Sequence, residues 1–94
     1  MGCQDTMYDV ASGLPAVRRV YDEAGPNARP GGLYFPDEGN SRSLSLGFHH
    51  DDRFENVFFV EWADGKLTVT YGLTGESLPI AAQQLARVQA KCPK

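Results

Sequence analysis

The sequence predicts an α+β fold in which an N-terminal helix, an antiparallel meander of three or four strands and a C-terminal helix form a single domain over residues 1–94. Three observations support this prediction. Apolar residues recur at steps of three and four near both ends of the chain, which is the period of an amphipathic helix. Residues 41–49 alternate between polar and apolar side chains, as in a strand with one solvated face. Asp64-Gly65 separates two runs rich in β-branched and aromatic residues, which is typical of a two-residue hairpin turn.

The first predicted helix runs from Met7 to Ala24 and contains a fault. Gly13 and Pro15 lie in its middle, and Pro15 has no N–H to donate within a helix. Because the apolar stripe keeps its phase across the fault, we expect a kink at Pro15 rather than a break. If the helix does break, Ser12 is the expected cap of the second piece.

The strands follow a loop at residues 25–32 that is rich in Gly and Pro. Leu33-Tyr34-Phe35 predicts a brief edge strand that ends at Pro36. In the strand after it, the alternation places serines such as Ser43 and Ser45 in water. The apolar set of that strand is expected to face the core: Leu44, Leu46 and Phe48.

The hairpin turn sets the register of the last two strands, so that Ala63 is expected opposite Lys66 and Trp62 opposite Leu67. The other face of the hairpin carries polar residues that suit water, but also Val57 and Phe59, which do not. The first face is wholly apolar and is assigned to the core: Phe58, Val60, Trp62, Leu67, Val69 and Tyr71.

The C-terminal helix is expected to begin after Ser77, which can cap it, with Pro79 tolerated in the first turn. Both helices are expected to cover the same apolar sheet face. The last helix has a narrow apolar stripe that points Cys92 toward the body of the protein, within reach of Cys3: Leu78, Ala81, Leu85, Val88 and Cys92.

The two cysteines near the chain ends have three interpretations. The favoured one is a disulfide between Cys3 and Cys92, because an even number of cysteines in a small chain is typical of an oxidising compartment. Closing so long a loop stabilises the fold by about 4 kcal/mol. The second is a lipid anchor at Cys3, since Met-Gly-Cys-Gln-Asp-Thr matches an N-myristoylation pattern beside a palmitoylatable Cys, and Gly-Cys also occurs at bacterial lipoprotein cleavage sites. The third is two free thiols.

The formal net charge is −3, and it is unevenly distributed. Residues 1–64 carry five Arg against eleven Asp and Glu, whereas residues 65–94 carry four Lys and Arg against one Glu. This distribution argues against a nucleic-acid partner, which favours a basic stripe, and suits a cationic protein partner instead. No apolar run approaches the ~20 residues that a membrane-spanning helix needs, so we expect no membrane span.

One cluster of potential metal ligands stands out: His49, His50, Asp51, Asp52 and Glu55. Imidazole and carboxylate together suit a transition metal. Adjacent residues of a strand point to opposite faces, however, so the two imidazoles are not expected to converge. We therefore interpret the cluster as a solvated turn and expect no metal.

An apolar patch on the sheet face opposite the helices is the favoured binding site: Tyr34, Phe35, Val57 and Phe59. A large exposed apolar patch usually marks an interface. Acidic residues of nearby loops are expected to form its rim: Asp37, Glu38, Asp51, Asp52 and Glu55. The alternative is that the loop at residues 25–40 folds over the patch and covers it.

These observations predict a small exported protein, periplasmic or otherwise extracytoplasmic, that binds a protein partner. An inhibitor or an immunity-type protein that blocks a secreted hydrolase fits its size, acidity and compartment. We expect no catalytic residue and no cofactor, and hence a binding protein rather than an enzyme. Two alternatives remain open: a metal-binding protein or metal-assisted enzyme using His49, His50 and Asp52, and a lipid-anchored accessory protein modified at Cys3.

Overall fold

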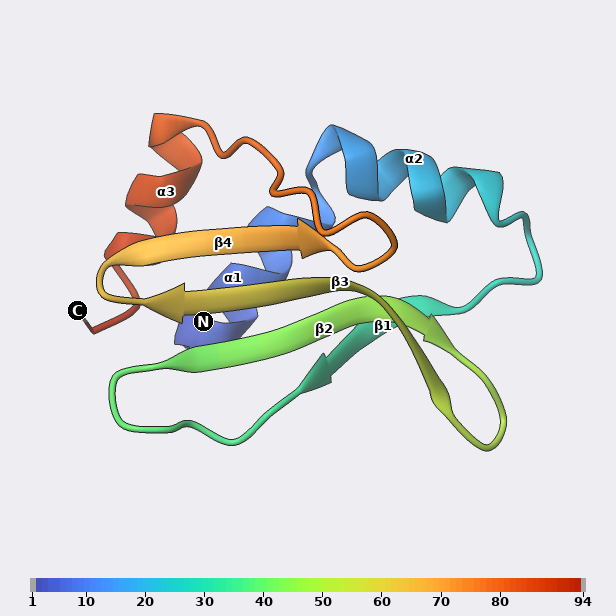
Figure 1. Cartoon of the computed structure of the whole chain (residues 1–94), viewed down its shortest axis with the longest axis horizontal. Coiled ribbons are helices and arrows are strands. Elements are labelled where there is room, and N and C mark those ends of the chain that lie inside the picture. The colour runs from blue at the N-terminus through green and yellow to red at the C-terminus, as the bar shows by residue number, and fades with distance from the viewer. Residues whose placement is uncertain (1, 94) are drawn as a thin grey trace.

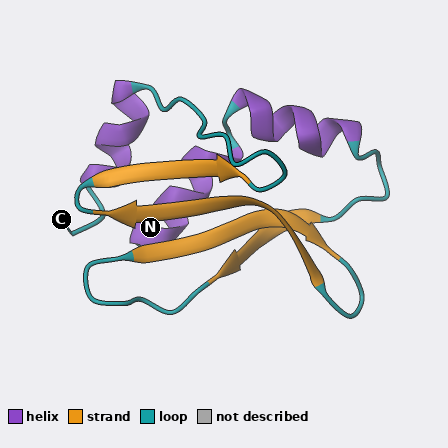
Figure 2. Ribbon diagram, in the orientation of Figure 1, coloured by secondary structure: helices purple, strands orange, loops and turns teal. Residues whose placement is uncertain are grey.

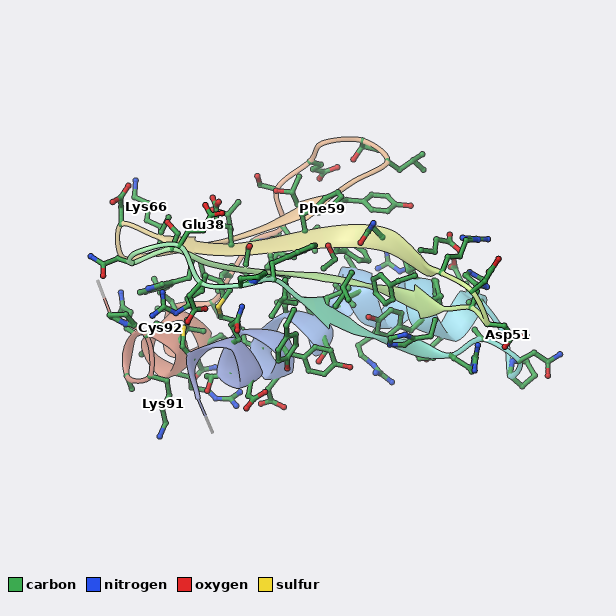
Figure 3. The ribbon with its side chains drawn as sticks, turned by 90° about the horizontal axis from the view of Figure 1, so that it is seen from below. Glu38, Asp51, Phe59, Lys66, Lys91 and Cys92 are labelled. Carbon is green, nitrogen blue, oxygen red and sulfur yellow. A yellow bond between two sulfur atoms is a disulfide. The ribbon has the colours of Figure 1, made fainter. Side chains whose placement is uncertain are left out.

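A four-stranded antiparallel sheet with helices on one face makes up the fold in the computed structural model, which describes residues 2–93. The strands lie in the order β1-β2-β3-β4, so the sheet is a meander (Figure 1, Figure 2). Figure 3, which views the sheet edge-on, shows the helices on one side of it and the loop that follows β4 rising on the other side. This arrangement confirms the predicted α+β fold. Its elements are α1 (Cys3–Ser12), α2 (Pro15–Glu23), β1 (Pro30–Tyr34), β2 (Arg42–His49), β3 (Phe54–Ala63), β4 (Lys66–Tyr71) and α3 (Ala82–Gln89).

The N-terminal helical region breaks at Leu14 instead of kinking at Pro15. Leu14 has extended backbone with φ −65° and ψ 142°, and Pro15 is the first residue of α2. The proline ring disfavours helical backbone in the residue before it, whereas proline itself suits the first helical position. Ser12 does not cap α2, because its hydroxyl donates to the carbonyl of Asp9 within α1. The apolar stripe keeps its phase because α1 and α2 both bury side chains against the same side of the sheet.

Strand β1 begins earlier than predicted and includes Gly31 and Gly32, which the composition assigned to a loop. A Cβ on Gly31 would lie 2.7 Å from Nε2 of His49, and a Cβ on Gly32 would lie 2.8 Å from the ring of Tyr8. Side chains from β2 and α1 therefore fill the space that a larger residue would need. The glycines allow close packing here rather than a turn.

The hairpin of β3 and β4 has the predicted register, with Ala63 opposite Lys66 and Trp62 opposite Leu67. Asp64 and Gly65 have φ values of 52° and 73°, as the expected turn requires. Between β2 and β3 the register shifts at Leu46 and Gly47, which makes a β-bulge in β3.

The chain after β4 pairs with the sheet before it turns into a helix. The N–H of Tyr71 donates to the carbonyl of Glu76, and the N–H of Leu78 donates to that of Val69, each at 2.8 Å. An edge strand has outward-pointing backbone groups that need partners, and this segment supplies them. Helix α3 therefore begins at Ala82 rather than after Ser77.

The core lies between the sheet and the helices, and its largest fully buried side chains include Trp62, Phe58 and Met7. The segments around Cys3 and Cys92 are bonded to each other, and the second is also hydrogen-bonded to the sheet. Cys3 and Cys92 form a disulfide with a Cα–Cα distance of 4.8 Å, which confirms that prediction. The indole N–H of Trp62 also donates to the carbonyl of Pro93. Apolar packing thus holds the helix layer to the sheet, and the disulfide links α1 to the segment after α3 within that layer.

Candidate functional site

The sheet face opposite the helices, called the open face below, carries three exposed apolar side chains. Leu33 is 40%, Phe35 is 38% and Phe59 is 48% exposed. Phe59 lies on β3, and Figure 3 shows it on the side away from the helices. Leu33 of β1 is paired with Ser45 of β2, and Ser45 is paired with Phe59 of β3. Leu33 and Phe59 therefore lie on the same face, on either side of Ser45. We call Leu33, Phe35 and Phe59 the apolar patch.

Ser45 is fully buried beneath this patch, although the alternation of β2 placed it in water. Its cross-strand neighbours Leu33 and Phe59 stand on either side of it and exclude solvent. Within residues 2–93 its hydroxyl has no hydrogen-bond partner. A buried hydroxyl without a partner costs free energy, so the fold does not require a serine at this position.

Two adjoining hollows of about 360 and 300 Å³ run along the open face beside the patch. They share Phe35, Ser43 and Glu61 and therefore lie next to each other, and the two together are treated below as one groove. Glu38 lies at one end of this groove, and Phe59 lies farther along it. We call this feature the open-face groove.

The electrostatic character of the groove is acidic. Among the described residues that line it, Glu38 and Glu61 are the charged ones, and none is Lys, Arg or His. Neither glutamate forms an ion pair in the part of the chain that the structure describes. The sequence singled out Glu38 as a rim residue but not Glu61, although Glu61 shares the solvated hairpin face with Phe59.

Tyr34 does not belong to the open face, which corrects the predicted patch. Its hydroxyl donates to Asp5 of α1 at 3.0 Å, and its ring lies 6.2 Å from that of Tyr8. Burial, and then the hydrogen bond to Asp5, raise the pKa of Tyr34 to about 12. Alternation within the short run at residues 33–35 identifies the right pair, because it separates Tyr34 from Leu33 and Phe35.

Val57 sits in the β-bulge of β3 and is half-buried against the core cluster. Its carbonyl accepts a hydrogen bond from the N–H of Gly72 at 2.8 Å. Gly72 also lies close to the ring of Phe59, where a Cβ would be 3.0 Å from Cε2. The segment after β4 therefore packs beside Phe59, whereas the loop at residues 25–40 leaves the patch exposed.

The predicted acidic rim is divided between the two ends of the sheet. Asp51 lies at the opposite end of the molecule from Glu38, with Phe59 between them (Figure 3). Asp52 follows Asp51 in the same turn. Most of the other rim carboxylates are engaged locally: Asp51 with Arg29 at 3.1 Å, Asp37 with Arg42 at 3.2 Å, and Glu55 with His50 at 2.9 Å. Of the predicted rim, Glu38 is the member that lines the groove.

The histidine and aspartate residues of the cluster considered as potential metal ligands do not converge. His50 faces Glu55, whereas the ring of His49 packs edge-on against Phe54 at 4.8 Å. Across residues 2–93, no group of three or more His, Cys, Asp or Glu side chains is placed to hold a metal ion.

The sulfur of Cys3 is bonded to that of Cys92. A sulfur atom in a disulfide cannot at the same time carry a lipid through a thioether or a thioester, so a lipid anchor on the sulfur of Cys3 requires a different covalent state. Met1, which opens the myristoylation pattern, lies outside the described residues. Over the part of the chain that the structure covers, no helix combines the length and apolar character needed to cross a membrane.

Comparison of the chain with protein-family models, with curated proteins and with solved structures finds no match.

Proposed function

We propose that this chain is a small exported protein that binds a protein partner through the open face of its sheet. The observation that carries the proposal is the apolar patch of Leu33, Phe35 and Phe59, whose side chains stay 38–48% exposed in the folded chain. Exposed apolar groups that a fold does not bury are typical of interfaces, and aromatic residues contribute most to binding energy there. An inhibitor or immunity-type protein that blocks a secreted hydrolase is the class that best fits the size and acidity.

The disulfide supports the proposed location. Disulfides persist in oxidising compartments, and they are most useful to small domains whose cores are limited. The Cys3–Cys92 bond spans 89 positions of the sequence and joins α1 to the turn that follows α3. We therefore propose a periplasmic or otherwise extracytoplasmic location.

Binding rather than catalysis is proposed because of how the polar side chains of the groove are arranged. Nucleophilic catalysis requires a nucleophile that is hydrogen-bonded to a base. Among the described residues, Ser41 and Ser43 donate no side-chain hydrogen bond to a His, Asp or Glu. His49 packs against Phe54, away from the groove.

The proposal is tested by isothermal titration calorimetry against a panel of secreted basic hydrolases, lysozymes among them. For any hydrolase that binds, Phe59→Ala is expected to weaken the affinity by about tenfold or more, because it truncates an aromatic side chain at the centre of the surface. Asp51→Lys serves as the control, since Asp51 lies at the far end of the molecule and pairs with Arg29. Equal affinities for Phe59→Ala and the wild type would exclude the open face as the binding surface.

A further inference from the structure

We propose that the open-face groove receives a Lys or Arg side chain of the partner, held between Glu38 and Glu61 and packed against Phe35. This inference rests on the proposed function and specifies the chemistry of the partner: an extended segment with a cationic residue next to an apolar one. Three features of the groove support this inference: the geometry of its polar side chains, the absence within the described chain of a cation paired with its glutamates, and the aromatic side chain in its wall.

The geometry places hydrogen-bonding groups on both sides of Glu61. Glu61 of β3 is paired with Ser43 of β2 and with Thr68 of β4, so the three side chains form a row across the open face. Within residues 2–93 the hydroxyls of Ser43 and Thr68 form no side-chain hydrogen bond. The row therefore offers a carboxylate flanked by acceptor oxygens, which match the donors of an ammonium or guanidinium group.

The charge of the groove is uncompensated, unlike that of most acidic residues near it. Asp37 in the same loop as Glu38 is paired with Arg42 at 3.2 Å, and Asp9 on the helix side is paired with Arg87. Glu38 and Glu61 both border one hollow and share no cation within the described chain. A positive side chain entering there is attracted by both carboxylates at once.

Phe35 gives the groove an aromatic wall. It lines both hollows beside Glu61 and is 38% exposed, so a bound side chain would cover it. A cation near an aromatic face gains further stabilisation, and a guanidinium gains most because it stacks as a plane and donates five hydrogen bonds. Arg is accordingly expected to bind more tightly than Lys. The apolar neighbour in the partner segment would cover Phe59.

A second copy of this chain is a poorer occupant than a cationic partner. Each copy presents Glu38 and Glu61 in its groove, so two open faces in contact bring like charges together. Lys66 lies on the same side of the sheet but does not line the groove (Figure 3). It also forms no ion pair within the described residues.

The test uses two peptides that differ in charge alone: acetyl-Gly-Leu-Arg-Leu-Gly-amide and its analogue with citrulline in place of Arg. Each is titrated into the isotope-labelled full chain and followed by amide chemical shifts. The Arg peptide is expected to shift the amides of Phe35, Ser43, Phe59 and Glu61, and to bind about fivefold more tightly than the citrulline peptide. Raising the salt concentration from about 50 to about 500 mM is expected to reduce this difference.

Charge variants assign the effect to residues. Glu61→Gln and Glu38→Gln are each expected to weaken binding of the Arg peptide by about threefold and to leave the citrulline peptide unaffected. Glu23→Gln is the matched control, because Glu23 ends α2, on the helix side of the sheet, and is exposed. It removes the same charge and should leave both affinities unchanged. Circular dichroism confirms that each variant is folded.

The inference is overturned if the two peptides bind equally, if the shifted amides lie elsewhere, if Glu23→Gln weakens binding as much as Glu61→Gln, or if neither peptide binds. Its failure can be distinguished from failure of the proposed function. A partner that depends on Phe59 but not on Glu38 or Glu61 overturns the inference alone. A partner that binds independently of Phe59 overturns the proposed function.

Discussion

The two faces of the sheet differ in burial: the helix side forms the core, whereas the open face leaves apolar side chains partly in water. Phe58 and Phe59 are neighbours in β3, yet Phe58 is 1% exposed beneath the helices and Phe59 is 48% exposed on the open face. The core is complete without Phe59, because the helix side alone buries Trp62, Phe58 and Met7 entirely or almost so. The exposed surface of the open-face apolar residues is thus not explained by packing of the core.

The polar groups of the two faces differ in the same way. On the helix side, Tyr34 donates to Asp5, Arg87 pairs with Asp9, and the indole of Trp62 donates to a backbone carbonyl. On the open face, the side chains of Ser43 and Glu61 form no hydrogen bond or ion pair within the described residues. Hydrogen bonds made inside the protein serve stability, whereas exposed groups without partners remain available to a ligand. The difference supports our proposal that the helix side stabilises the fold and that the open face binds a partner.

Alanine substitution of the two adjacent phenylalanines gives the largest contrast. Phe58→Ala is expected to reduce the free energy of unfolding by about 3–5 kcal/mol, because it leaves a cavity in a close-packed core. Phe59→Ala is expected to reduce it by about 1 kcal/mol or less, since half of its side chain is already in water. Urea unfolding followed by tryptophan fluorescence measures both, with Trp62 as the probe.

If the two substitutions reduced the free energy of unfolding by similar amounts, the contrast between the two faces would be wrong. Such a result would show that Phe59 stabilises the fold through its contact with Gly72 and its cover over Ser45. The apolar patch would then need no binding partner to explain it.

Removing the disulfide is expected to have the next largest effect. The double substitution Cys3→Ser, Cys92→Ser should lower the free energy of unfolding by about 2–4 kcal/mol, because the unfolded chain regains the freedom that the cross-link removes. The bond joins α1 to the turn that follows α3, so the helix side should loosen most. Hydrogen exchange should accelerate more in α1 and α3 than in β2 and β3.

Wild-type protein measured in reductant is the control and should match the double variant. An unfolding midpoint that is the same with and without reductant would contradict the role assigned to the bond. Equal acceleration of exchange across helices and strands would remove the distinction between the faces.

The parts of the fold that could be predicted from sequence are those set by local chemistry. The register of β3 against β4 follows from a turn whose two residues, Asp64 and Gly65, both adopt positive φ. The break at Leu14 was hidden because a stripe that continues in phase is what two helices on one sheet face also produce. The pairing of residues 76–78 with β4 depends on the needs of a distant edge, which no local pattern records.

The parts of the candidate site that could be predicted from sequence are likewise those set by local patterns. Phe59 follows from hairpin register, and Phe35 from the short apolar run before Pro36. Tyr34 faces the helix side, because the run at residues 33–35 alternates between the two faces instead of lying on one of them. The predicted rim residues lie at both ends of the sheet, because proximity to a strand end in the sequence does not show to which end of the sheet a loop belongs.

The smallest expected effect concerns Ser45, the fully buried serine of the open face. Ser45→Ala removes a buried hydroxyl that has no partner within residues 2–93, so the free energy of unfolding should stay unchanged or rise by up to about 1 kcal/mol. Ser43→Ala is the matched control, because that serine lies two residues away on the same strand and is only partly buried. Urea unfolding of both variants measures the difference. A loss of more than about 1 kcal/mol for Ser45→Ala would mean that the hydroxyl makes a stabilising contact, and that the open face contributes to the fold through more than its apolar side chains.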